Sequence, residues 1–226
     1  LPECPYFNPL FGKEEVIIEN MATTFKMLTQ DSPQFFQDMN DNLIRNSLKV
    51  LKRLYGNRAT MLDMSRLIHN TNDIGKKMIS EFSRLSTETE EMAKENEDIA
   101  GWFLGEYFAE RSKTYEHCSG MRSLIGKLTS NKYLRRILNP PNGENDIDFE
   151  RNLAEGGVLA IATAQGDLGD LGTFLGYFII LNLQSAVFKR PGNENTRLPH
   201  SLYIDEFQKY SNVGFADMLT QGRSYR

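Results

Sequence analysis

Two adjacent carboxylates, Asp205 and Glu206, directly follow a short apolar run, Ser-Leu-Tyr-Ile at 201–204. A run of this kind after a polar loop predicts a short buried β-strand. At the carboxyl end of a strand in an open α/β sheet, side chains lie where ligands bind. One carboxylate could hold a magnesium ion there, and its neighbour could orient or deprotonate an attacking water molecule. The simpler alternative is a strand that ends in two solvated acids without a chemical role.

An arginine follows these carboxylates after a stretch with helical spacing. Phe215, Met218 and Leu219 recur at helical intervals, and the pattern ends at Gly222 and Arg223. Because glycine commonly ends helices, the simplest interpretation of Arg223 is a surface residue just beyond a helix.

The segment from Ile204 to Arg226 resembles the Walker B region of the conjugative coupling proteins, the TraG/TraD/TrwB-like DNA-translocating ATPases of type IV secretion. In that family an aliphatic strand ends in Asp-Glu-Phe, as at 205–207. A short helix then leads to a Gly-Arg pair, as at 222–223. A looser likeness covers three upstream stretches, at 8–10, 31–55 and 156–163.

The resemblance implies a role for each of three charged residues. Asp205 would belong to the shell of a Mg²⁺ ion bound with ATP, and Glu206 would activate the attacking water. Arg223 would be an arginine finger that reaches the γ-phosphate held by a neighbouring subunit, which requires a closed ring.

The resemblance also implies cofactors, partners and a location. The family forms hexamers that use ATP and Mg²⁺ to deliver DNA to a type IV secretion channel. The partners would be single-stranded or processed plasmid DNA, the relaxase complex and the channel proteins. The longer protein would lie at the cytoplasmic face of the bacterial membrane, attached through segments outside this chain, and this part would be soluble.

The phosphate-binding loop of such an ATPase is missing from the sequence. The motif G-x-x-x-x-G-K-[ST] cradles phosphates with backbone amides and a lysine. The Gly-Lys pairs at 12–13, 75–76 and 126–127 do not fit its spacing. By the resemblance, the loop would precede Leu1. We therefore expect a piece of a longer protein that by itself neither binds nor hydrolyses ATP appreciably.

The first 138 or so residues carry helical patterns of apolar side chains. The acidic stretch 86–98 is interpreted as a solvated helix face or a loose connection, of which a loop with helical tendency is favoured, and 99–121 predicts one long helix. The aromatic residues of that helix fit a core better than stacking surfaces for single-stranded DNA. Other helices are predicted at 14–28, 33–55, 60–67, 74–82 and 123–138.

A strong break at 139–143, Asn-Pro-Pro-Asn-Gly, marks the predicted domain boundary. Beyond it, the apolar run 157–163 predicts a strand buried on both faces, and 173–189 predicts a helix. With the strand at 201–204 these form one βαβ unit. The predicted fold class is α/β with a large all-α domain, and the resemblance implies a helical bundle followed by part of a RecA-like P-loop NTPase sheet. The predicted domains are an extended lead-in from the motor domain at 1–13, an all-α domain at 14–139 and a partial nucleotide-binding domain at 140–226.

Composition limits the partners and the location. The net charge of -4 argues against a chain coated with nucleic-acid-binding charge, but it allows a local basic patch. Cys4 and Cys118 show neither zinc spacing nor a disulfide framework, which predicts a reduced, cytosolic location. No run looks long and apolar enough to span a membrane, and no signal peptide is visible. Solvated helix faces, or surfaces that track phosphates, are predicted around Lys49, Lys52, Arg53, Lys127, Lys132, Arg135 and Arg136.

Two other functions remain open at this point. A related ring ATPase of the FtsK/HerA or VirB class would share the same Walker B chemistry, although Phe207 and the helical insertion favour a coupling protein. A non-catalytic helical interaction module, in which the Asp-Glu pair is incidental, is the alternative from another class.

Overall fold

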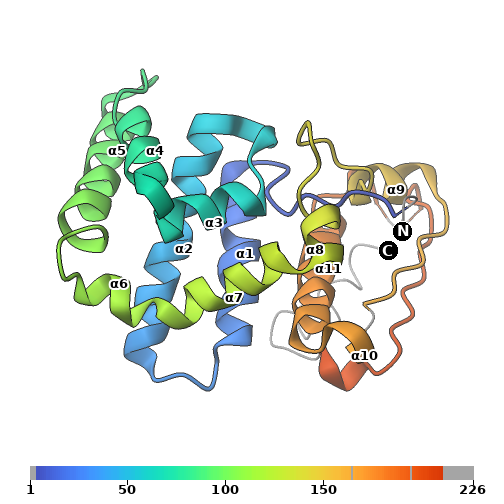
Figure 1. The fold of residues 1–226 in the computed structure, drawn as a ribbon. Helices are drawn as coiled ribbons and strands as arrows, with labels where there is room; N and C mark the ends of the chain where they lie inside the picture. Colours follow the sequence, from blue (N-terminus) through green and yellow to red (C-terminus); the bar gives the residue numbers. More distant parts are fainter. Residues whose placement is uncertain (1–3, 164, 194, 211–226) are drawn as a thin grey trace. The chain divides into compact units, whose positions relative to one another are not determined.

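The structure is a computed structural model that describes residues 4–163, 165–193 and 195–210 (Figure 1). The chain divides into two compact units. Unit 1 comprises Leu1–Ala22 and Thr29–Asp146, and unit 2 comprises Thr23–Leu28 and Ile147–Arg226.

Unit 1 is helical, because amphipathic stretches bury their apolar faces against one another. The predicted helices at 14–28, 33–55, 60–67 and 74–82 are confirmed, with ends that differ by a residue or two from those expected. Two 3₁₀ turns, Gly56–Arg58 and Thr71–Asp73, connect neighbouring helices. The helices are α1 (Glu14–Leu28), α2 (Gln34–Tyr55), α3 (Met61–His69), α4 (Ile74–Phe82), α5 (Glu90–Trp102), α6 (Lys113–His117), α7 (Ser119–Ser130) and α8 (Lys132–Ile137).

The start of α3 shows how local sequence sets these ends. The Thr60 hydroxyl accepts a hydrogen bond from the backbone N–H of Asp63, and the Asp63 carboxylate accepts one from the backbone N–H of Thr60. This reciprocal pair satisfies two N–H groups that the first turn of a helix leaves without partners. The predicted cap at Thr60 is confirmed.

Two predictions in the middle of unit 1 are wrong. From Glu90 on, the acidic stretch is a helix and not the favoured loop, because Thr89 caps α5 and the carboxylates of Glu90 and Glu91 lie in its first turn, where they interact favourably with the helix dipole. The stretch 99–121 is not one helix either. A π-helical turn, Phe103–Tyr107, ends α5, and Arg111 then adopts a left-handed conformation (φ 56°) before α6 begins.

The aromatic residues around this π-helical turn form part of the core of unit 1. Phe103 and Tyr107 are fully buried, and the Tyr107 hydroxyl donates a hydrogen bond of 3.0 Å to the carbonyl of Ile68. The Trp102 ring stacks on Tyr107 with 5.5 Å between ring centroids. The predicted core role of these residues is confirmed.

The two ends of unit 1 lie side by side. The backbone N–H of Tyr6 donates to the Asp146 carboxylate (2.6 Å), and the backbone N–H of Asp146 donates to the carbonyl of Tyr6 (3.1 Å). The N–H of Phe7 donates to the carbonyl of Ile137 (2.9 Å). We call this arrangement, residues 6–12 against 137–146, the clasp.

Unit 2 contains α9 (Phe149–Glu155), α10 (Gln165–Leu168) and α11 (Asp170–Phe188). Helix α11 packs on α9, and its Phe174 ring lies 5.4 Å from that of Phe25 in the last turns of α1. The predicted helix at 173–189 is confirmed as α11. By length and a mean hydropathy of 1.6, α11 could cross a membrane, contrary to the sequence-based expectation. Half of its apolar window is buried inside the protein.

The predicted strands at 157–163 and 201–204 are wrong, and with them the predicted α/β class. Neither stretch has regular secondary structure, and the described residues contain no β-strand and no RecA-like sheet. Val158 is 98% exposed and Tyr203 is 90% exposed, so neither stretch is the buried strand that its composition suggested. The physical reason is that a strand exists only where a second backbone pairs with its N–H and C=O groups, and no described segment does so here.

Candidate functional site

The two carboxylates lie where the stretch 201–204 ends. Glu206 adopts a left-handed conformation (φ 51°), and a single 3₁₀ turn, Phe207–Lys209, follows it. Such a conformation is unfavourable for a residue with a Cβ atom, so surrounding contacts must hold it. Tyr210, buried after this turn, packs against Tyr177 and Ile180 of α11 and so fixes the turn on the helix.

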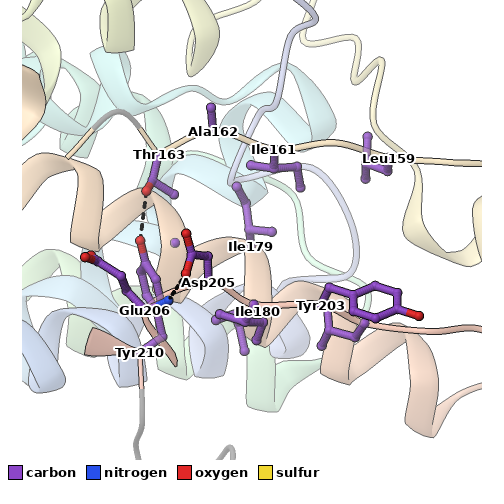
Figure 2. Close-up of a pocket in the computed structure, with 13 residues that line it drawn as sticks. Leu159, Ile161, Ala162, Thr163, Ile179, Ile180, Tyr203, Asp205, Glu206 and Tyr210 are labelled. Carbon is purple, nitrogen blue, oxygen red and sulfur yellow. Dashed lines mark hydrogen bonds between the residues drawn. The ribbon is translucent and has the colours of Figure 1, made fainter. Parts of the chain in front are cut away.

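A pocket of about 390 Å³ opens beside these carboxylates (Figure 2). One wall is the stretch 159–163, another is 202–206, and α11 forms the third with Gly176, Ile179 and Ile180. Figure 2 shows Thr163, Asp205, Glu206 and Tyr210 near one end of the pocket and Leu159 and Tyr203 toward the other. The pocket is therefore polar at one end and apolar along the rest.

A hydrogen bond connects two distant segments at the polar end of the pocket. The hydroxyls of Thr163 and Tyr210 share a hydrogen bond of 2.8 Å although they lie 47 residues apart in sequence. Gly176 is required beneath them, because a Cβ atom there would overlap the Tyr210 ring. The sequence-based prediction missed both hydroxyls. Thr163 was recognised only as the end of an apolar run, and nothing in the sequence relates it to Tyr210.

Asp205 and Glu206 are both exposed and have different partners. The Asp205 carboxylate accepts a hydrogen bond of 2.9 Å from the backbone N–H of Glu206, so it stabilises its own turn. The Glu206 carboxylate forms an ion pair with Lys209. The structure thus brings the predicted magnesium ligand and the predicted water activator to one end of one pocket. Arg223 and the helix predicted before it lie outside the described residues.

The described residues fit part of a Mg²⁺·ATP complex. Asp205, Glu206 and the nearby hydroxyl of Thr163 offer the oxygen ligands that Mg²⁺ prefers, and Mg²⁺ often takes only one or two protein carboxylates alongside phosphates and water. Among the described residues no group of three or more His, Cys, Asp or Glu side chains is arranged to hold a metal ion by itself. None of the thirteen described lining residues is basic, so this surface does not fit the triphosphate.

Comparisons of the chain with protein-family models, with curated proteins and with solved structures find no match.

Proposed function

We propose that this chain is part of an ATP-driven DNA translocase of the conjugative coupling type, a hexamer that delivers DNA to a type IV secretion channel. The observation that supports this proposal most is the adjacency of Asp205 and Glu206 at the polar end of a pocket. A carboxylate for the metal ion and a neighbouring group that positions the attacking water are recurring parts of sites for phosphoryl transfer to water.

In this proposal Asp205, Glu206 and Arg223 have separate roles in ATP hydrolysis. Asp205 would contribute an oxygen to the Mg²⁺ shell, and Glu206 would orient or deprotonate the water that attacks the γ-phosphate. In the described arrangement the Glu206 carboxylate forms an ion pair with the exposed Lys209, which it would have to leave to act on water. Arg223 would stabilise transition-state charge across a subunit boundary. Bound ATP supplies the phosphoanhydride bond whose hydrolysis drives translocation.

Because the pocket is acidic, the rest of an ATP site would have to supply positive charge. A triphosphate beside two carboxylates needs compensating positive charge, which a phosphate-binding loop and its lysine provide. We propose that another segment of a longer protein supplies that loop. The 226-residue chain alone is then expected to be inactive, and robust ATP hydrolysis by the purified chain would contradict this proposal.

The decisive test is the ATPase activity of the longer protein that contains this chain, with and without single-stranded DNA. Glu206→Gln should lower the DNA-stimulated rate by a factor of about 10² to 10⁴, the usual contribution of a general base. The matched control is Glu155→Gln, an exposed glutamate at the end of α9 outside the pocket, which should leave the rate unchanged. Equal activity of the Glu206 variant and the wild type would remove Glu206 from the chemistry.

A second function is favoured by a specific observation. The regular secondary structure of the described residues is all helical, and the pocket lacks a described basic side chain. Both features fit a non-catalytic helical interaction module. The absence of ATPase activity in wild type and variants alike, under conditions that permit oligomerisation, would favour this module over the translocase.

A further inference from the structure

A second pocket of unit 2, which we call the arginine pocket, has a volume of about 240 Å³. It is lined by residues of α9, by the last turn of α11 and by the loop that follows α11, within 150–154, 186–191 and 196–198. It shares no lining residue with the pocket beside Asp205. The two pockets contact α11 at Gly176 and at Ala186, which lie about 15 Å apart at a rise of 1.5 Å per residue. The arginine pocket is therefore a separate site.

Basic side chains dominate the charge of the arginine pocket. Lys189, Arg190 and Arg197 line it, and its one described acidic residue is Glu150. The Glu150 carboxylate lies 3.6 Å from the Lys189 ammonium, and both side chains are exposed. An exposed ion pair of this kind contributes little and opens easily. The described lining thus carries three positive charges and one negative charge.

Arg190 is held in place by one nitrogen of its guanidinium group. Its Nη2 atom donates to the carbonyls of Leu153 (3.1 Å) and Leu198 (2.6 Å). The Leu153 carbonyl lies in the last turn of α9, where carbonyls lack partners within the helix, so a capping role explains the Nη2 bonds. Within the described residues, Nε and Nη1 of Arg190 have no hydrogen-bond partner, and Arg190 forms no ion pair with a carboxylate. These donors remain available to a ligand.

A second guanidinium group is fixed next to Arg190. The Arg197 Nε atom donates to the carbonyl of Pro191 (3.1 Å), and its Nη2 atom donates to those of Arg190 (2.9 Å) and Gly192 (2.8 Å). Burial lowers the pKa of Arg190, and the nearby charge of Arg197 lowers it further. On a solvated helix face, by contrast, long cationic side chains are free to move apart. Here backbone carbonyls hold two like charges together beside a cavity, and an anion in the cavity relieves their repulsion.

The lining favours a phosphate monoester over other anions. Such a group carries a charge of about -1.5 to -2 at pH 7 and three strong acceptor oxygens, whereas a carboxylate carries a single charge. Guanidinium donors match the geometry of phosphate oxygens. Half of the lining is apolar, which suits the carbon atoms of an ester and not inorganic phosphate alone: Leu153, Ala154, Ala186, Pro191 and Leu198.

We propose that the arginine pocket binds a small organic phosphate monoester. Arg190 donates to the phosphate oxygens through Nε and Nη1, Arg197 adds positive charge, and the apolar residues contact the organic part. This site goes beyond the proposed function, because it requires neither ATP hydrolysis nor DNA.

The test is isothermal titration calorimetry of the 226-residue chain with phenyl phosphate, at low ionic strength and without other polyvalent anions. Saturable binding is expected at millimolar concentrations. Benzoate has the same ring but loses at least one charge-assisted hydrogen bond, so it should bind at least about 10-fold more weakly. The absence of saturable binding, or equal binding of benzoate, would overturn the proposal. Displacement of phenyl phosphate by an oligothymidylate without terminal phosphates would assign the pocket to nucleic acid and would also overturn it.

Arg190→Gln should weaken the binding of phenyl phosphate by about 10- to 100-fold, the usual effect of losing hydrogen bonds to a charged group. The matched control is Arg151→Gln, an exposed arginine on α9 that does not line the pocket. It makes the same change in net charge and should leave the affinity unchanged. Equal effects of the two variants would overturn the proposal.

A variant that gains affinity separates binding from stability, since Arg190 also supports two backbone carbonyls. Glu150→Gln removes the one described acidic residue of the lining and should tighten the binding of phenyl phosphate by about 2- to 5-fold. Glu155→Gln on the same helix lies outside the pocket and should leave the affinity unchanged. A damaged fold cannot produce tighter binding. Unchanged or weaker binding by the Glu150 variant would therefore overturn the proposal even if Arg190→Gln lowers the stability measured by circular dichroism.

Discussion

Asn8 in the clasp supports the sharpest stability prediction for unit 1. Its side chain is buried, and its Nδ2 group donates to the carbonyls of Asn57 (3.3 Å) and Ala59 (2.9 Å). Its Oδ1 atom accepts a hydrogen bond of 3.0 Å from the backbone N–H of Leu10. Asn8→Ala removes all three bonds. At about 1 kcal/mol each, the expected loss in free energy of unfolding is about 3 kcal/mol.

The assay is thermal and urea unfolding of the 226-residue chain, monitored by circular dichroism. A loss of about 3 kcal/mol should lower the midpoint of the unit 1 transition by about 6–12 °C, from about 2–4 °C per kcal/mol for a domain of this size class. The matched control is Asn46→Ala on α2, whose side chain makes a hydrogen bond only at the surface, to Asn42. That change should stay within about 0.5 kcal/mol of the wild type.

A second variant, Asn8→Asp, removes the Nδ2 hydrogen-bond donor while keeping nearly the same side-chain shape. It keeps an acceptor for the N–H of Leu10, but it turns a carboxylate oxygen toward the carbonyls of Asn57 and Ala59. Near neutral pH it should therefore destabilise more than Asn8→Ala, because a buried charge meets two acceptors. Acid should partly restore stability as the carboxyl group becomes a donor. The reasoning is refuted if Asn8→Ala behaves like Asn46→Ala, or if Asn8→Asp is as stable as the wild type.

Two further predictions concern pH and packing in unit 1. The hydrogen bond from Lys49 lowers the pKa of Glu95 below its usual 4.5, with a further contribution from Arg53. Because the folded pKa is the lower one, this stability is present above pH 4.5 and is lost as pH falls through the folded value. Urea midpoints over that range should show it, and Glu95→Gln should reduce the dependence. Gly75→Ala places a Cβ atom against a backbone carbonyl of α3 and should cost about 1–3 kcal/mol or more. Gly101→Ala, where the space is open, should be neutral or stabilising by up to about 1 kcal/mol in the same unfolding assay.

The helices of unit 1 were predictable because their signals are local. An apolar stripe with a period near 3.6 residues and a cap such as Thr60 act within one or two turns, and both can be recognised in the sequence. The break inside 99–121 was not predictable in this way. The π-helical turn satisfies the packing of Phe103, Tyr107 and Phe108 around their neighbours, and that packing is a tertiary requirement.

The stretches 157–163 and 201–204 show where local sequence signals fail to predict structure. The composition of 157–163 and 201–204 favours strands, but neither stretch has regular secondary structure. Strand pairing, however, depends on a second backbone at the right distance, which no property of the stretch itself can supply. Composition therefore predicted two strands that the described structure does not contain.

The candidate site divides in the same way. Sequence alone determined that Asp205 and Glu206 are adjacent and follow an apolar run, because adjacency is a property of the chain. Only the tertiary structure decided that Thr163 and Tyr210 share a hydrogen bond beside them, and that Gly176 leaves room for the Tyr210 ring. The physical reason is that contacts between distant residues depend on how the helices and the stretches between them pack together. Local propensity carries no information about that packing.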